Sequence, residues 1–292
     1  MTESLTFCLY SLFALALIRG IKAPGLGNFL VAGALLGLLV LTRAGYAALI
    51  VGVPLLILVA FLRDRRAGSA AGYAAAFIMG CAAVVSPWMV RNALSVGHWG
   101  LTEEYGSVAL IERFAFNDMT AREFWLAFPY CLPAIGPPLV DAAAGTGAMD
   151  RFVYYTPKSF FHAGRRTRDK LVEQHGRLDP LIGGLIRDEM RNDGWRHLLV
   201  SVPLAWCGMW VGGALGLVLV PLLAGAAVRA RGMPHRLLLI YSAPAVGMLG
   251  LHALIANGET RYNLILIGPL ATAGAWGALR IVGRGKDRAA AR

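Results

Sequence analysis

The feature that most constrains this chain is a series of seven apolar stretches joined by short loops. The stretches cover residues 5–18, 26–42, 46–62, 67–90, 198–228, 237–256 and 262–282. A helix that crosses a bilayer needs roughly 20 apolar residues, with about 17 as the lower limit, so only the first stretch is short for a span. Hydrophobic residues make up 57% of the chain and charged residues 15%, and the 35 glycines suit closely packed membrane helices. We therefore predict an all-α, polytopic membrane helical bundle of about seven spanning helices.

Residues 91–197 interrupt this pattern with a polar segment. The segment carries 13 Lys/Arg and 13 Asp/Glu, whereas the rest of the chain carries 15 Lys/Arg and only 4 Asp/Glu. The whole net charge of +11 therefore lies in short loops and the tail, which indicates membrane orientation and not nucleic-acid binding. We predict membrane helices in 1–90, an outward-facing, mostly helical domain at 91–197, membrane helices in 198–283, and a basic cytoplasmic tail at 284–292.

The positive charges outside this segment predict the orientation of the chain. If every stretch crosses the membrane once, one side holds Arg19, Lys22, Arg63, Arg65, Arg66, Arg229, Arg231, Arg236, Arg280, Arg284, Lys286, Arg288 and Arg292. Only Arg43 and Arg261 lie in short loops on the other side. The side rich in Lys and Arg is cytoplasmic. We therefore expect a multi-pass protein of the bacterial inner membrane, with its main soluble domain in the periplasm.

Inside 91–197 the sequence predicts several short helices. Residues 119–140 mix aromatic side chains with four prolines, which predicts a helix on the membrane surface followed by a kinked segment. Residues 141–150 are a turn-rich loop, and 167–175 and 179–192 predict two amphipathic helices. Asp179-Pro180 is a suitable N-cap and first turn for the second of them.

The sequence carries few motifs of soluble enzymes. The cysteines at 8, 81, 131 and 207 have neither CxxC nor metal-ligand spacing, so neither a zinc site nor a disulfide framework is indicated. We find no P-loop, no dinucleotide-binding fingerprint and no HExxH motif. Chemistry is therefore expected from charged residues at the membrane boundary.

Two arginines at outer helix ends are candidates for binding a lipid phosphate. Arg43 ends an apolar helix and departs from the charge bias, and its guanidinium could bind a phosphate by paired hydrogen bonds. The alternative is an arginine that extends to the interface. Arg91 follows Pro87-Trp88. The alternative for Arg91 is helix termination beside an aromatic belt residue.

A second group of candidates lies near the last two apolar stretches. Arg261-Tyr262 begins the last stretch, and His252 lies on the outer half of the preceding one. An ionisable residue inside a membrane is a functional hypothesis by default, and a histidine satisfied by a helix neighbour is the competing interpretation.

Acidic residues give a third group of candidates. Glu3 is the only acid at the start of the first stretch, and Glu103-Glu104 follow the fourth. Paired carboxylates could bind a divalent cation or deprotonate an acceptor hydroxyl, and solvated surface acids are the alternative. We assign no metal ligands.

Four stretches carry a resemblance to a known family. They are Thr2-Glu3-Ser4-Leu5 with Ala32 to Gly37 and Leu41-Thr42-Arg43; Pro87-Trp88 with Arg91-Asn92 and Gly97; Ile111-Glu112-Arg113-Phe114 followed by Phe124-Trp125 and Leu132-Pro133; and Arg261-Tyr262 with Pro269. In this order they resemble the GT-C superfamily of membrane glycosyltransferases (family 39), the branch of the protein O-mannosyltransferases and the aminoarabinose transferases of lipid A. The resemblance covers most of the chain and is weak between 141 and 195.

The resemblance implies transfer of a sugar from a polyprenyl-phosphate carrier to a lipid, protein or glycan acceptor on the outer face of the membrane. By resemblance, Arg43 and Arg113 match positions that contact the carrier phosphate. Glu3 matches an acidic position near a metal or the acceptor, and a divalent cation is one candidate cofactor. Arg261 and Tyr262 match a signature of the last helix to which no role is assigned.

One departure from the family leaves an alternative open. The family's first outer loop carries a catalytic Asp, and Thr2-Glu3 matches a motif from the middle of such an enzyme. The chain is therefore expected to be a C-terminal portion whose partner is the N-terminal half. The alternative is a non-catalytic membrane remnant or a lipid-binding scaffold subunit. A transporter is less favoured, because the stretches show no inverted repeat.

Overall fold

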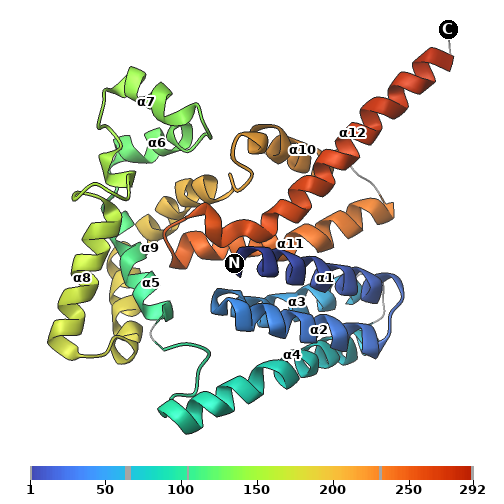
Figure 1. Ribbon diagram of the computed structural model, residues 1–292, viewed down its shortest axis with the longest axis horizontal. Coiled ribbons are helices and arrows are strands. Elements are labelled where there is room, and N and C mark those ends of the chain that lie inside the picture. The colour runs from blue at the N-terminus through green and yellow to red at the C-terminus, as the bar shows by residue number, and fades with distance from the viewer. Residues whose placement is uncertain (1, 63–66, 104, 230–231, 291–292) are drawn as a thin grey trace. The chain divides into compact units, whose positions relative to one another are not determined.

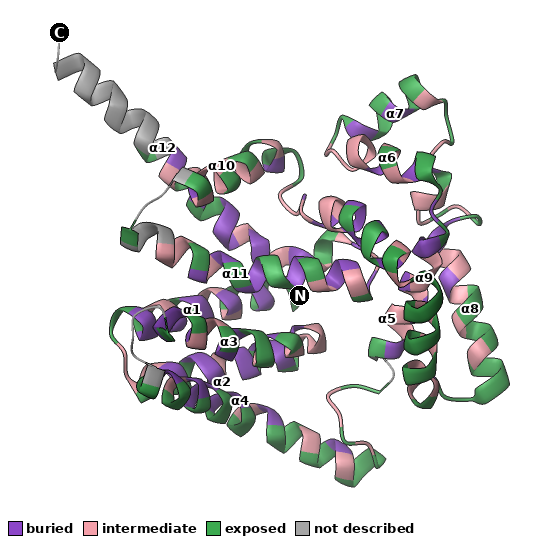
Figure 2. Cartoon of the chain, turned by 180° about the vertical axis from the view of Figure 1, so that it is seen from behind, coloured by how far each residue is buried: buried purple, intermediate pink, exposed green. Residues whose placement is uncertain are grey.

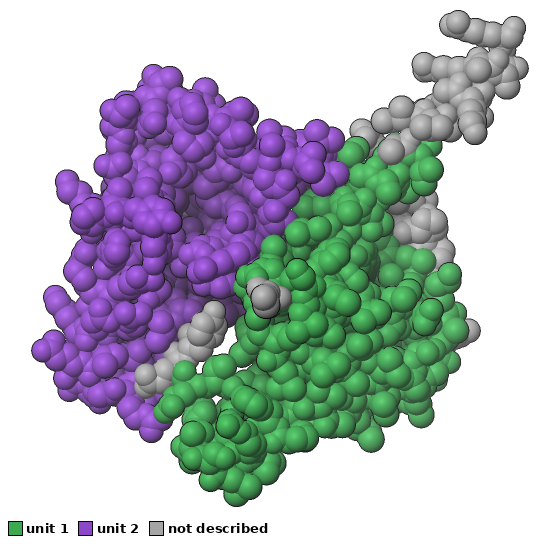
Figure 3. Space-filling view, in the orientation of Figure 1, with its two compact units in different colours: residues 1–103, 221–248, 264–292 green, residues 104–220, 249–263 purple. Residues whose placement is uncertain are grey.

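The computed structural model describes residues 2–62, 67–103, 105–229 and 232–290 (Figure 1). Within these ranges the regular structure consists of helices, and no β-strand occurs. This confirms the all-α prediction. The chain forms two compact units (Figure 3): unit 1 contains 1–103, 221–248 and 264–292, and unit 2 contains 104–220 and 249–263. Most of the predicted outer segment, 91–197, falls in unit 2.

Unit 1 is built mainly from long apolar helices. They are α1 (Thr2–Lys22), α2 (Leu26–Thr42), α3 (Leu49–Leu62), α4 (Ala67–Val96), most of α11 (Gly232–Ile255) and α12 (Ile267–Ala290), with part of α10 (Gly216–Arg229). Helix α2 packs against α1 and α4, and α3 packs against α4 (Figure 1). Buried aromatic side chains, among them Tyr10, Phe13 and Phe29, fill this packing. Figure 2 shows buried residues alternating with exposed ones along these helices.

The exposed positions of these helices are often apolar. On α3, Val51, Leu55 and Val59 are more than half exposed, although they are large aliphatic residues. Scattered apolar residues occur on any protein surface, but a helix that is apolar on both its buried and its exposed faces suits a hydrocarbon environment. The composition of unit 1 therefore fits a membrane protein.

Glycines allow α2 and α4 to approach each other closely. A Cβ on Gly33 of α2 would lie 1.9 Å from the carbonyl oxygen of Phe77, and one on Gly80 of α4 would lie 2.0 Å from that of Leu30. No side chain fits in that space, so the two backbones are in direct contact. Gly33 and Gly37 are four residues apart, the spacing of the small-residue motif in membrane helix pairs. This is where the glycine content of the sequence contributes to packing.

Four helical segments among the described residues are long and apolar enough to cross a membrane. They are Thr2–Lys22, Ala44–Leu62, Gly68–Val96 and Arg236–Ile255. A fifth exists if Asp179–Gly208 and Gly213–Val228, which are bent by 108° at a short break, count as one span, and Leu26–Thr42 is a shorter apolar helix. The membrane class is thus supported, whereas the count of seven spans stays a prediction. The break divides the predicted stretch 198–228 at a turn where Gly213 has a φ of 56°, a conformation that glycine adopts readily.

Unit 2 consists of shorter helices and the end of α11. Its helices are α5 (Tyr105–Phe114), α6 (Ala121–Tyr130), α7 (Gly136–Ala144), α8 (Phe160–His175) and α9 (Asp179–Gly208), with short 3-10 helices η2 (Ala115–Asp118), η3 (Asp150–Phe152), η4 (Gly213–Leu215) and η5 (Thr260–Leu266), which continues into unit 1. Helix α5 packs on α8 and α9, and α6 packs on α7 and α9. A buried cluster around Phe116 and Phe160 joins η2, α6, α8, α9 and the end of α11.

The prolines and caps of unit 2 determine where its helices begin. Residues 119–140, predicted as a helix followed by a kinked segment, form α6, a turn and the first part of α7. Helix α6 starts with a capping box, in which the hydroxyl of Thr120 accepts from the amide of Glu123 and the Glu123 carboxylate accepts from the amide of Thr120. Helix α9 begins at Asp179 as predicted, although its N-cap is Leu178. The predicted end at 192 coincides with a kink at Asp193, whose backbone is not helical, and a second helical part of α9 runs from there to Gly208.

Candidate functional site

Arg113 is the most deeply buried charged residue of unit 2, with 0% of its surface exposed. Its Nε donates to the carbonyl of Ala253 at 2.7 Å, and Nη1 donates to Oδ1 of Asn117 at 2.9 Å. Its Nη2 donates to the carbonyl of His197 at 3.1 Å and to the hydroxyl of Ser201 at 2.9 Å. One guanidinium therefore joins α5, η2, α9 and the end of α11.

This geometry favours a structural role for Arg113. Burial lowers the pKa of Arg113 to about 10, so the side chain is still a cation at neutral pH. A buried cation needs acceptors around it, and here the acceptors are backbone carbonyls and neutral side chains. A carrier phosphate would have to displace these groups to reach it. The role in phosphate binding that the resemblance implies for Arg113 stays a prediction.

His252 belongs to a second buried network in unit 2. Its Nδ1 lies 2.9 Å from Oδ1 of Asn263, and Nδ2 of Asn263 donates to the carbonyl of Gly208 at 3.1 Å. Because the Asn263 oxygen is an acceptor, Nδ1 of His252 carries the proton in this pair. The ring of Tyr262 lies beside the imidazole, with centroids 5.8 Å apart. The network connects the end of α11 to η5 and α9, so the histidine is satisfied across the fold rather than along its own helix.

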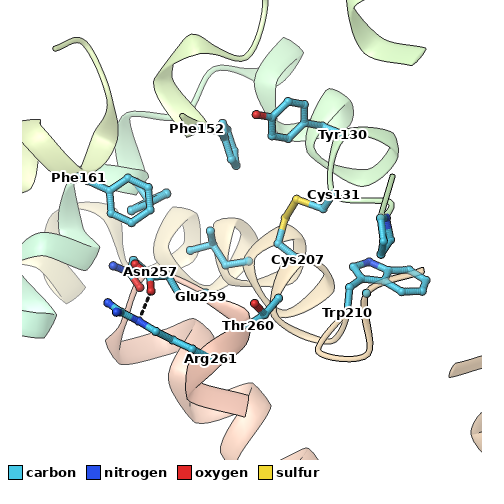
Figure 4. A pocket seen from close by; sticks show the side chains of 15 residues that line it. Tyr130, Cys131, Phe152, Phe161, Cys207, Trp210, Asn257, Glu259, Thr260 and Arg261 are labelled. Atoms are coloured by element: carbon cyan, nitrogen blue, oxygen red, sulfur yellow. Dashed lines mark ion pairs between the residues drawn. A yellow bond between two sulfur atoms is a disulfide. The ribbon is translucent and has the colours of Figure 1, made fainter. Parts of the chain in front are cut away.

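Next to these networks, unit 2 contains an open cavity of about 480 Å³ (Figure 4). Its volume lies within the range of roughly 300–1,000 Å³ that is usual for small-molecule sites. The cavity is lined by Phe116, Tyr130, Cys131, Pro133, Phe152, Phe161, Leu204, Cys207, Trp210, Gly213, Asn257, Gly258, Glu259, Thr260 and Arg261. Aromatic side chains from several elements thus meet a polar loop. Burial raises the pKa of Tyr130, so its phenol remains protonated and can donate a hydrogen bond.

The polar loop runs from Asn257 to Arg261, between α11 and η5. The carboxylate of Glu259 forms an ion pair with Nε of Arg261, drawn as a dashed line in Figure 4. Gly258 has a φ of 69°, and a Cβ at this position would lie 2.8 Å from the carbonyl oxygen of Leu204. Both the turn and the close approach require glycine. The backbone at Gly258 thus fixes where Glu259 and Arg261 meet the cavity.

A disulfide between Cys131 and Cys207 also lines the cavity. The cysteines are 76 residues apart in sequence and meet because α6 packs on α9. Beside the disulfide, Nε1 of Trp206 donates to the carbonyl of Phe128 at 2.8 Å. The interpretation that the cysteines indicate no disulfide was wrong, because only tertiary packing brings these two together.

Neither a protein-family model, nor a curated protein, nor a solved structure matches this chain. The cavity combines an apolar aromatic wall, a guanidinium, a carboxylate and an amide. Such a set can bind an amphiphilic ligand, neutralise an anionic group and accept a proton.

The structure distributes the predicted residues between the two units. Arg113, His252, Arg261 and Tyr262 lie in unit 2, and of these Arg261 lines the cavity. Glu3, Arg43 and Arg91 lie in unit 1.

In unit 1 the three predicted residues have protein partners. Nη2 of Arg43 lies 3.3 Å from the carboxylate of Glu3, in a partly exposed ion pair. Such exposed pairs contribute little to stability, because water and salt screen them. Arg91 lies over the ring of Trp88 and donates to Asn92. Helix α4 continues past Arg91 to Val96, so the helix does not end at this residue.

The structure offers no set of ligands for a metal ion among the residues it describes. No three His, Cys, Asp or Glu side chains gather there as a metal site requires. Glu104, and the predicted cytoplasmic charges Arg63, Arg65, Arg66, Arg231 and Arg292, lie outside the described residues. No step is therefore assigned to a divalent cation.

Several cavity residues were absent from the sequence predictions. They are Tyr130, Cys131, Cys207, Trp210, Asn257 and Glu259. The sequence held two usable signals: Trp206 and Trp210 are one helical turn apart, and Glu259 lies two residues before the predicted Arg261. Neither signal specifies which other element faces these side chains.

Proposed function

We propose that this chain is a membrane glycosyltransferase that takes a sugar from a polyprenyl-phosphate carrier and passes it to a lipid, protein or glycan acceptor. The observation that carries the proposal is the ion pair of Glu259 and Arg261 at the edge of an aromatic cavity, directly after the apolar helix α11. A lipid-linked sugar phosphate needs an apolar surface, a cation and a cavity for a small neutral group. This part of unit 2 supplies all three.

The two charged residues fit complementary steps of such a transfer. An oxygen of the acceptor forms a bond to the anomeric carbon, while the bond from that carbon to the phosphate oxygen breaks and its electron pair stays on the phosphate. Arg261, whose side chain is 62% exposed, neutralises the departing phosphate. Glu259, whose side chain is 25% exposed, takes the proton of the acceptor hydroxyl. A phosphate that binds Arg261 competes with Glu259 for the guanidinium and frees the carboxylate.

Transfer is tested with the whole chain reconstituted in liposomes with a farnesyl-phosphate-linked sugar. Bacterial membrane extract supplies the acceptors, and the readouts are farnesyl phosphate release and label on the acceptor. Replacing Glu259→Gln should lower turnover about 100-fold or more, because a general base contributes roughly 10²–10⁴. Arg261→Gln should weaken both binding and turnover. Glu173→Gln and Arg187→Gln, exposed on α8 and α9, are the matched controls and should change neither.

A non-catalytic, lipid-binding scaffold is the second candidate. The buried hydrogen bonds of Arg113 and the pairing of Arg43 with Glu3 favour it, because these charges are engaged by protein groups. Binding of the lipid-linked sugar without any turnover in the wild-type chain would support this candidate. Full turnover in both Glu259→Gln and Arg261→Gln would contradict the assigned roles.

We further propose that the chain lies in the bacterial inner membrane, with unit 2 on the periplasmic side. The Cys131–Cys207 disulfide supports this, because disulfides form in oxidising compartments such as the periplasm and are rare in the cytosol. The positive charges of the short loops support the same orientation.

The disulfide gives a direct test of this orientation. In a Cys8→Ser, Cys81→Ser background, a chain expressed in bacteria should resist a maleimide-polymer label until it is reduced, and then take up two labels. Cys131→Ala with Cys207→Ala should lower the stability of unit 2 by about 4 kcal/mol, because the bond closes a long loop of the unfolded chain. Immediate labelling of both cysteines without reduction would contradict a periplasmic unit 2.

A further inference from the structure

Two buried polar atoms in the cavity wall lack a hydrogen-bond partner within the described chain. They are Nε1 of Trp210, a residue only 6% exposed, and Oδ1 of Asn257. Figure 4 shows Trp210 and Asn257 on different sides of the cavity, with the disulfide between them. Buried polar groups in native proteins nearly always have partners, and a group without one needs an explanation. Here both orphaned groups belong to residues that line one cavity.

The two groups have opposite requirements. The indole N–H only donates, and the amide oxygen only accepts. A hydroxyl can satisfy either, because it donates one hydrogen bond and accepts others. A ligand with several hydroxyls on one rigid ring therefore offers a partner of each kind. A purely apolar ligand would fill the cavity and leave both groups without partners.

The remaining lining suits the faces of such a ring. Phe152 and Phe161 present aromatic surface, and the protonated phenol of Tyr130 adds another donor. A sugar ring has apolar C–H faces and a polar edge of hydroxyls, so it matches an aromatic wall flanked by separate polar groups.

We infer that Trp210 and Asn257 are specificity-determining residues that hydrogen-bond to ring hydroxyls of the sugar. The inference rests on the proposed function for the identity of the ligand, and it adds how the sugar is distinguished from the bare carrier phosphate. A site with buried polar groups rejects a ligand that lacks their partners, because the groups then stay unsatisfied.

Trp206 provides a matched control for Trp210. It lies four residues earlier, near the end of α9, and the two indole rings are 4.9 Å apart in an edge-on arrangement. Its Nε1, unlike that of Trp210, already donates to the carbonyl of Phe128. The same Trp→Phe change thus removes a satisfied donor at 206 and an unsatisfied one at 210.

The test compares two probes on the reconstituted chain: farnesyl phosphate, and farnesyl phosphate carrying a hexose or a pentose. Trp210→Phe and Asn257→Leu should each weaken binding of a sugar-bearing probe about 2- to 10-fold, the effect of one neutral hydrogen bond, and leave farnesyl phosphate unchanged. Trp210→Phe should also keep or raise the unfolding temperature, because it removes a buried unpaired group. Trp206→Phe should lower the unfolding temperature and preserve the ratio of the two affinities.

Three results would overturn the inference: unchanged sugar affinity in both variants, an equal loss for both probes, or no binding of either sugar-bearing probe. The inference about sugar binding and the proposed transfer reaction can each fail without the other. Selective sugar binding through Trp210 and Asn257 without turnover would sustain the inference and refute the transfer. Turnover in the wild type, together with unaltered sugar affinity in both variants, would support the transfer and refute the inference.

Discussion

Replacing Arg113→Met should destabilise unit 2 by about 3–5 kcal/mol, the range for removing one partner from a buried charged network. The change deletes four hydrogen bonds and removes the guanidinium donor from the carbonyls of Ala253 and His197, of which the His197 carbonyl keeps the hydroxyl of Ser201. Asn117 and Ser201 lose a partner as well. Arg113→Lys should recover only part of the loss, because one ammonium cannot reproduce the spread of a planar guanidinium.

The measurement is chemical unfolding in detergent, in which the unfolding of unit 2 is monitored through the labelling of Cys131 and Cys207 under reducing conditions. Arg187→Met, an exposed arginine of α9, is the control and should change stability by less than about 0.5 kcal/mol. If Arg113 instead binds the carrier phosphate, Arg113→Met would leave the unfolding midpoint unchanged and abolish lipid binding. That outcome would contradict the structural role.

Replacing Gly33→Ala should destabilise unit 1 by about 3 kcal/mol, at the upper end of the usual effect of overpacking. The added methyl would lie 1.9 Å from the carbonyl oxygen of Phe77, a backbone atom that cannot rotate away. Helices α2 and α4 would have to separate along their contact. Gly80→Ala should act in the same way from the opposite helix, since its methyl would lie 2.0 Å from the carbonyl oxygen of Leu30.

Gly27→Ala is the matched control for Gly33→Ala, because it lies on the same helix with no atom near the added methyl. It should be neutral or slightly stabilising, since alanine favours the helix over glycine by about 1 kcal/mol. Thermal unfolding of the purified chain in detergent compares the variants. Equal unfolding temperatures for Gly27→Ala and Gly33→Ala would contradict the close packing of α2 on α4.

The helices of unit 1 could be predicted almost completely, because each apolar stretch is a local property of the sequence. The first stretch looked short, yet α1 spans 21 residues, since a helix also includes polar residues at its ends. In unit 2 an amphipathic pattern up to residue 192 and an apolar stretch from residue 198 suggested two segments. This agrees with α9, in which two helical parts meet at a kink at Asp193, whose backbone is not helical.

The candidate site could be predicted only in part. Arg261 stood out because it departs from the charge bias of the loops, and the structure finds it at the cavity. Arg113 was selected by a motif, and nothing in the motif revealed that Ala253 and His197 would surround its guanidinium. The disulfide had no sequence signature either, since its cysteines lie 76 residues apart.

The sequence by itself determined the class of the protein: helical, rich in apolar segments and asymmetric in charge. Those properties follow from the transfer free energy of individual side chains and from the hydrogen-bond needs of the backbone, and both are local. The tertiary structure alone decided which charged side chains are buried and hydrogen-bonded within the fold and which are exposed at a cavity. Arg113 and Arg261 are the same residue type, and they differ only in the acceptors that distant segments bring to them. Packing of α5 and η2 against α9 and the end of α11 made that difference, and no pattern along the chain encodes it.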